Sequence, residues 1–138
     1  MQEAYSLPGQ TPTISRMRRQ IESSGDVLDK LVDHVQLTIK GLRSGDLHAS
    51  EQTFGKVTEE LKEFLSVLAR AESYGGKMTI ILKVFQARLT EYFHRLEGLQ
   101  RDGELGVFLD VLQYEVVPLL AGWDGVKSGL MDYLDDVG

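Results

Sequence analysis

This chain of 138 residues contains no cysteine. The absence excludes disulfides, metal sites built on thiolates and catalysis by a cysteine nucleophile. It fits the reducing conditions of a cytosol without requiring them. The length suits a single domain that buries a substantial core without covalent cross-links.

Positive charge is also scarce, since 15 lysines and arginines face 21 aspartates and glutamates, for a formal net charge of −6. Nucleic-acid binding needs a clustered positive field, so we expect no nucleic-acid partner. One small basic group, Arg16, Arg18 and Arg19, is the exception. It is a candidate docking site for an acidic partner or nucleic acid, although a solvated helix face is the simpler explanation.

Long apolar runs are missing, and the uninterrupted ones span only a few residues. We therefore expect no membrane segment. The first residues lack a basic region followed by an apolar stretch, so they do not resemble a secretory signal. These features predict a soluble, cytoplasmic domain of bacterial type.

Four successive segments carry apolar residues at every seventh position, and a second apolar series fills the alternate steps of three and four. This spacing places an apolar stripe along a helix, and four stripes escape water only by packing together. We therefore expect an all-α fold. The seven-residue series are Ile14, Ile21, Leu28, Val35 and Leu42; Leu47, Phe54, Leu61 and Leu68; Met78, Phe85, Tyr92 and Leu99; and Leu105, Leu112, Leu119 and Val126. The alternate positions include Met17 and Leu31; Val57, Phe64 and Ala71; Leu82, Leu89 and Leu96; and Leu109, Val116, Trp123 and Leu130.

Short turns at residues 44–46, 74–76 and 101–103 separate these segments. Short connections make consecutive helices antiparallel, which predicts an up-down-up-down four-helix bundle over residues 12–138. Asp46 and Asp102 are the expected N-caps of the second and fourth helices. Pro118 predicts a kink in the fourth helix, because it lacks a backbone donor and crowds the carbonyl of Tyr114. Residues 1–11 predict a disordered tail.

The sequence offers little chemistry. Glu91 and His94 have the spacing of a bundle metal site, but the second such pair that a di-iron site needs is missing. His34 and His48 have no histidine partner at helical spacing. Residues 75–79 resemble part of a phosphate-binding loop, but no strand precedes them and the motif is incomplete. Glycines that end a helix are the better explanation for this segment. We expect no enzyme activity, metal or cofactor, and the alternative is a ligand- or metal-binding bundle using Glu91 and His94.

The fourth helix carries more apolar residues than one seam requires, and Ile80, Ile81 and Val84 form a smaller surplus on the third. Such a surplus is either core or a surface that another helix covers. We expect a contact with a partner helix, or self-association as a homodimer. The expected partner-binding residues are Val111, Tyr114, Pro118 and Leu120, where Pro118 shapes a groove and Tyr114 supplies a ring with a polar tip.

The segment from Phe108 to Leu120, FLDVLQYEVVPLL, followed by Trp123, resembles the end of small bacterial helical proteins associated with motility gene clusters. Residues 54–65 resemble their second helix, with Phe64 where tryptophan is expected. The resemblance covers about two-thirds of the chain. It implies an accessory or chaperone-like, non-enzymatic role and provides no catalytic residues.

Overall fold

The computed structural model describes residues 11–72 and 77–137, and these form helices with no β-strand among them. The predicted tail lies outside the described residues, apart from Thr11, which begins the first helix. The predicted turn at 74–76 also lies outside them. The helices are α1 (Thr11–Ser44), α2 (Leu47–Glu72), α3 (Lys77–Arg101), α4 (Leu105–Val111), α5 (Val117–Ala121) and α6 (Trp123–Val137), with a π-helical turn, η2 (Leu112–Val116), between α4 and α5.

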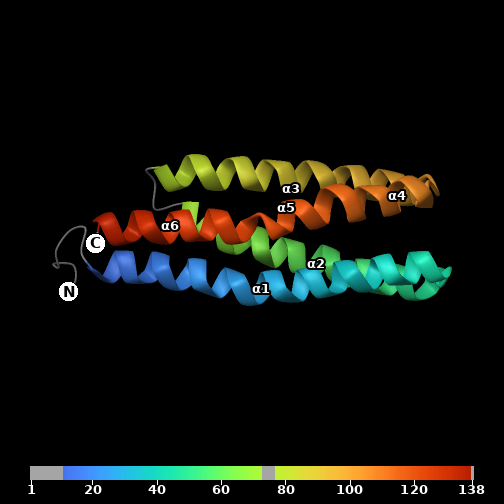
Figure 1. Cartoon of the computed structure of the whole chain (residues 1–138), viewed down its shortest axis with the longest axis horizontal. Coiled ribbons are helices and arrows are strands. Elements are labelled where there is room, and N and C mark those ends of the chain that lie inside the picture. Colours follow the sequence, from blue (N-terminus) through green and yellow to red (C-terminus); the bar gives the residue numbers. More distant parts are fainter. Residues whose placement is uncertain (1–10, 73–76, 138) are drawn as a thin grey trace.

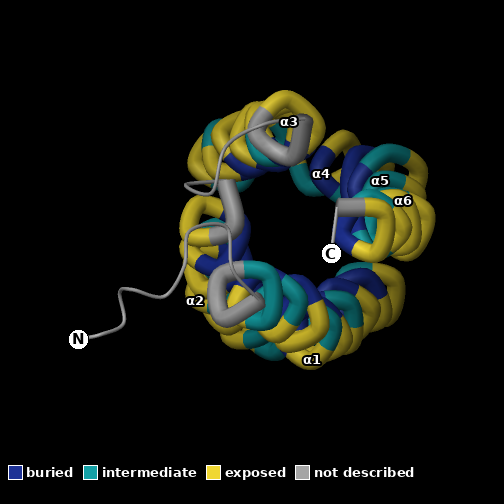
Figure 2. Tube along the Cα trace, turned by 90° about the vertical axis from the view of Figure 1, so that its left-hand side faces the viewer, coloured by how far each residue is buried: buried dark blue, intermediate teal, exposed yellow. Residues whose placement is uncertain are grey.

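The segments α4, η2, α5 and α6 follow one another as a single long, bent helix, which we call the last helix (Figure 1). The chain thus forms the predicted antiparallel bundle of four helices. Figure 2 shows them in a ring whose buried residues face inward, with α1 diagonally opposite α3. The first half of the last helix lies against both α1 and α3, whereas α5 and α6 follow α1.

Two turns at the same end of the bundle have the same backbone hydrogen bonds. After α1, Asp46 N–H bonds the Gly41 carbonyl at 2.9 Å and Gly45 takes a φ of 79°. After α3, Glu104 N–H bonds the Leu99 carbonyl at 2.9 Å and Gly103 takes a φ of 72°. Both are Schellman motifs, in which glycine accepts the left-handed conformation that stops a helix.

The predicted caps have different outcomes. Asp46 caps α2, because its carboxylate accepts a hydrogen bond from Ala49 N–H at 3.1 Å. Asp102 does not cap the last helix. The N-cap position there is Glu104, and it makes no side-chain capping bond.

The predicted seams of the first three helices are largely confirmed, since their central members are buried. Leu47 is wrong, because it lies at the start of α2 beside the turn and is exposed. The side chains of Ala71 and Met78 lie outside the described part of the chain. The confirmed buried positions are Met17, Ile21, Leu28, Leu31, Val35, Phe54, Val57, Leu61, Phe64, Leu68, Leu82, Phe85, Leu89 and Leu96.

The surplus apolar residues of the last helix belong mostly to the core, which corrects the expectation of an exposed arc. Val111 and Leu120 are each only 1% exposed, and Phe108 is buried as well. Val111 and Leu120 are nine residues apart, which in a regular α-helix places them on opposite faces, because each residue turns by about 100°. The π-turn reduces this separation by about 100°, because Val117 N–H bonds the Leu112 carbonyl five residues back and one extra residue enters the turn.

Candidate functional site

The bend of the last helix creates an open groove between this helix and α3. The bend is 20 degrees, and Pro118 stands just after the π-turn, in the first turn of α5. Proline is tolerated there because its missing N–H falls where the regular bonding pattern is already interrupted. From this point the last helix follows α1 and diverges from α3 (Figure 1).

We call this concavity the kink groove, and its volume is about 480 Å³. Three aromatic rings, Phe85, Tyr92 and Tyr114, contribute to its walls together with Pro118. Phe85 also reaches the core, where its ring centroid lies 5.2 Å from that of Trp123. The groove is lined by Phe85, Arg88, Tyr92, Tyr114, Glu115, Pro118, Leu119, Gly122 and Val126.

Two of the four predicted partner-binding residues therefore line one surface. Tyr114 is 67% exposed, and Pro118 beside it is exposed too. The expectation that Val111 and Leu120 share this surface is wrong, because the π-turn directs them into the core. The sequence does not predict the α3 wall of the groove. Phe85 and Tyr92 belong to a predicted seam, but nothing in the sequence shows which helix they face across the bundle.

One ion pair closes the end of the kink groove where α3 and η2 are in contact. Arg95 Nη1 lies 3.3 Å from Glu115 Oε1, and both side chains are partly exposed. An exposed pair of this kind contributes little stability, and it marks the place where the two walls meet. Arg88 is exposed on the α3 wall and forms no ion pair with any described residue.

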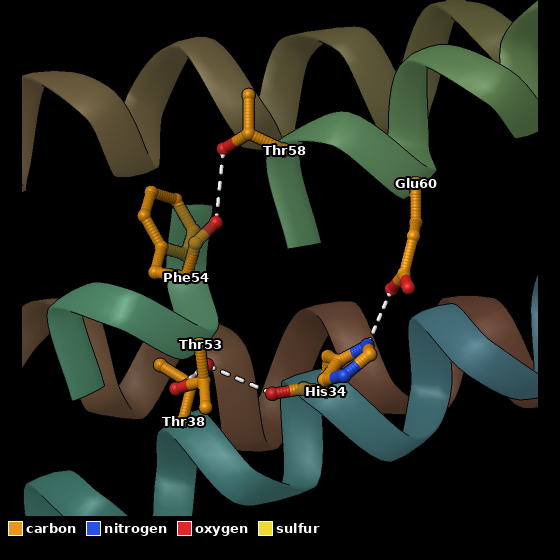
Figure 3. Close-up of polar contacts among 6 residues, drawn as sticks. All are labelled: His34, Thr38, Thr53, Phe54, Thr58 and Glu60. Carbon is orange, nitrogen blue, oxygen red and sulfur yellow. Dashed lines mark hydrogen bonds and ion pairs between the residues drawn. The ribbon is translucent and has the colours of Figure 1, made fainter. Parts of the chain in front are cut away.

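Figure 3 shows a second polar cluster, which joins α1 to α2. His34 Nδ1 lies 2.6 Å from Glu60 Oε1, and both side chains are mostly buried. The hydroxyls of Thr38 and Thr53 lie 2.9 Å apart, and that of Thr38 also bonds the His34 carbonyl at 2.8 Å. The His34–Glu60 and Thr38–Thr53 contacts run between the two helices, so this cluster ties α1 to α2.

The alternative site at Glu91 and His94 is not assembled in this structure. Both residues are exposed, and the nearest carboxylate to His94 Nδ1 is that of Glu97 at 3.9 Å. Among the described residues, no group of three or more His, Asp or Glu side chains is placed to hold a metal ion. A protein metal site of this type needs at least three ligands.

The basic group of α1 is divided. Arg16 and Arg19 are exposed, whereas Arg18 Nη2 lies 2.7 Å from Asp135 Oδ1 on α6. Arg18 thereby links the first and last helices at the end of the bundle where α1 begins and α6 ends. The three arginines do not form one continuous basic surface.

The last helix is more apolar than its short uninterrupted runs suggested. By length and composition the segment Leu105–Asp136 is sufficient to cross a membrane, with a mean hydropathy of 1.5 over 18 residues, of which 28% are buried in the bundle. Most of that window is therefore exposed on the surface of the bundle. A core helix passes the same test.

Comparison with known proteins gives no match to any protein-family model, and no curated protein or solved structure shows significant similarity to the chain. The relation to bacterial motility proteins therefore stays a prediction from the sequence.

Proposed function

We propose that this protein is a non-enzymatic binding module which holds an amphipathic helix of a protein partner in the kink groove. The exposure of Tyr114 at the edge of an apolar concavity carries the proposal. Tyrosine is enriched among the residues that dominate binding energy at protein interfaces, because its rigid ring buries a large area and its hydroxyl keeps a polar partner.

The shape of the kink groove favours a helix as the bound element. Its walls are two antiparallel helices, and their lining residues recur at intervals of three and four along each wall. A third helix laid between them presents apolar residues at the same intervals, which is the established mode of helix-in-groove recognition. The unpaired Arg88 favours an acidic residue on the partner's rim.

From the sequence resemblance to motility-associated proteins we further propose an accessory or chaperone-like role in the bacterial cytoplasm. A groove that covers the apolar face of a partner helix would keep that helix soluble until it is assembled. This part of the proposal depends on the sequence resemblance, whereas the binding surface depends on the groove.

Site-specific photo-crosslinking tests the surface. A photoreactive phenylalanine analogue replaces Tyr114 in one variant and Leu37, which is 48% exposed on α1, in a matched control. We expect position 114 to capture a defined protein in source-cell extract, and Tyr114→Asp to remove that protein from a pull-down while the helical signal in circular dichroism stays unchanged. Equal capture from position 37, or retention by Tyr114→Asp, rejects the kink groove as the binding site.

A further inference from the structure

The outer face of α3 carries an apolar ridge with a cation on each side. Ile80 is 68% exposed, Val84 is 56% exposed and Ala87 is exposed as well. Their spacing of four and three aligns them on one face of the helix, with Lys83 to one side and Arg88 to the other. Within the described residues neither cation forms an ion pair. We call this surface the α3 ridge.

A second groove lies between α1 and the last helix, on the side away from α3, and has a volume of about 450 Å³. Leu28, Val32, Leu120 and Ala121 supply the apolar part of its lining, which we call its floor. Carboxylates stand on both walls, Asp29 and Asp33 on α1 and Asp124 on α6. We call it the acid-rimmed groove.

The three carboxylates of the acid-rimmed groove are exposed, and none pairs with a cation in the described part of the chain. Lys127 of the last helix forms no ion pair with these carboxylates, and its Nζ lies 3.2 Å from the position that a Cβ on Gly25 would occupy, one turn before Asp29 on the same face of α1. Lys30 is exposed on the neighbouring face of α1. The rim thus carries three exposed carboxylates, none of them in an ion pair with a described residue, and their charge outnumbers that of the two lysines nearby.

We propose that the α3 ridge of one copy docks into the acid-rimmed groove of a second copy. An apolar ridge between two cations matches an apolar floor between carboxylates on both walls, so burial of the ridge also brings opposite charges together. In a protein whose net charge is −6, the α3 ridge has a cation on each flank, although Glu91 follows it on the same face, and the chain itself offers acidic surfaces that complement those cations.

This contact is head-to-tail. The α3 ridge and the acid-rimmed groove lie on different sides of the bundle, because α1 lies diagonally opposite α3 (Figure 2). A pair of bound copies therefore still presents one free ridge and one free groove, and such heterologous contacts extend into rings or filaments rather than closing as a two-fold dimer. The contact is separate from the kink groove, apart from Arg88, which borders both.

Three variants test the contact by light scattering after size-exclusion chromatography, at protein concentrations up to about 0.3 mM, which covers weak interfaces. Val84→Glu disrupts the ridge, and Asp29→Lys with Asp33→Lys reverses one wall of the groove. The matched control is Glu59→Lys with Glu63→Lys, which makes the same charge change at the same spacing on the exposed face of α2. Circular dichroism verifies that each variant is folded.

We expect the wild-type protein to form oligomers that grow with concentration. The ridge and groove variants should each weaken association at least about tenfold, and the control should not. The decisive sample is an equimolar mixture of the ridge and groove variants. Each retains the surface that the other lacks, so the mixture should form dimers and nothing larger.

A monomeric wild-type protein over this range, a mixture that stays monomeric, or a control that weakens association equally would each overturn the proposal. The Tyr114→Asp variant distinguishes this self-association from partner binding in the kink groove. It should self-associate like the wild type, whether or not it still binds a partner.

Discussion

The indole N–H of Trp123 donates a hydrogen bond to the hydroxyl of Ser24 over 3.2 Å, and both residues are fully buried. Ser24 in turn donates to the Ile21 carbonyl of its own helix. The edge of the Trp123 ring system also packs against Phe64, with ring centroids 5.5 Å apart. A polar residue in the α1 seam thus serves the largest side chain of the core, because a buried indole needs an acceptor.

Ser24→Ala should lower the free energy of unfolding by about 1–3 kcal/mol, because it leaves the Trp123 N–H unpaired in the core. Ser23→Ala is the matched control. Ser23 makes the same kind of bond, to the Gln20 carbonyl at 3.0 Å, but is exposed, so its replacement should change stability by less than about 0.5 kcal/mol. Urea denaturation of both variants measures the difference, and equal effects would contradict the assigned role of Ser24.

Leu120→Ala should cost about 2–5 kcal/mol, because it opens a cavity in the core. Leu119→Ala, at the adjacent and only partly buried position, should cost clearly less. An uninterrupted heptad predicts the reverse order, since Leu119 belongs to the seam expected from the sequence. Chemical denaturation of the pair therefore tests whether the π-turn sets the register of the last helix.

Pro118→Ala should change stability by less than about 1 kcal/mol. A proline in a regular helix interior costs about 3 kcal/mol, but Pro118 occupies the first turn of α5, where that cost is largely avoided. Leu109→Pro, within α4, is the control and should show the full cost. A large gain in the melting temperature of Pro118→Ala would mean that the proline strains the helix.

The His34–Glu60 pair should show a coupling energy of about 1 kcal/mol in a double-mutant cycle of alanine substitutions, because both groups are mostly buried and in close contact. The cycle for His94 and Glu97, which are exposed and 3.9 Å apart, should give no measurable coupling. Comparable values for the two pairs would show that burial adds nothing to the inter-helical contact.

The sequence predicts the bundle well wherever the heptad continues without interruption. In α1 the seam from Met17 to Val35 is buried as expected, and even Gly25 does not break the helix. The last helix departs from this pattern because a π-turn is a change in backbone bonding that no side-chain spacing records. Pro118 signals a bend, but it does not signal the extra residue before it.

For the same reason, the sequence predicts only half of the candidate site. Tyr114 and Pro118 reach the groove, whereas Val111 and Leu120 turn into the core. The other wall comes from α3, and a contact between residues that are far apart in sequence cannot be obtained from one helix at a time. The sequence indicates Ile80 and Val84 as apolar residues beyond the α3 seam, and the structure places both on the surface.

The tight join between α1 and α2 has a consequence for how the molecule opens. An added Cβ at Gly41 would lie 3.1 Å from Ser50 Cβ, so the two backbones approach closely at their turn, and the His34–Glu60 contact holds them further along. We expect native-state hydrogen exchange to show α1 and α2 as one slowly exchanging unit, since their contacts are local and buried. The backbone amides of α3 should exchange sooner, through a partial opening that leaves the α1–α2 pair intact.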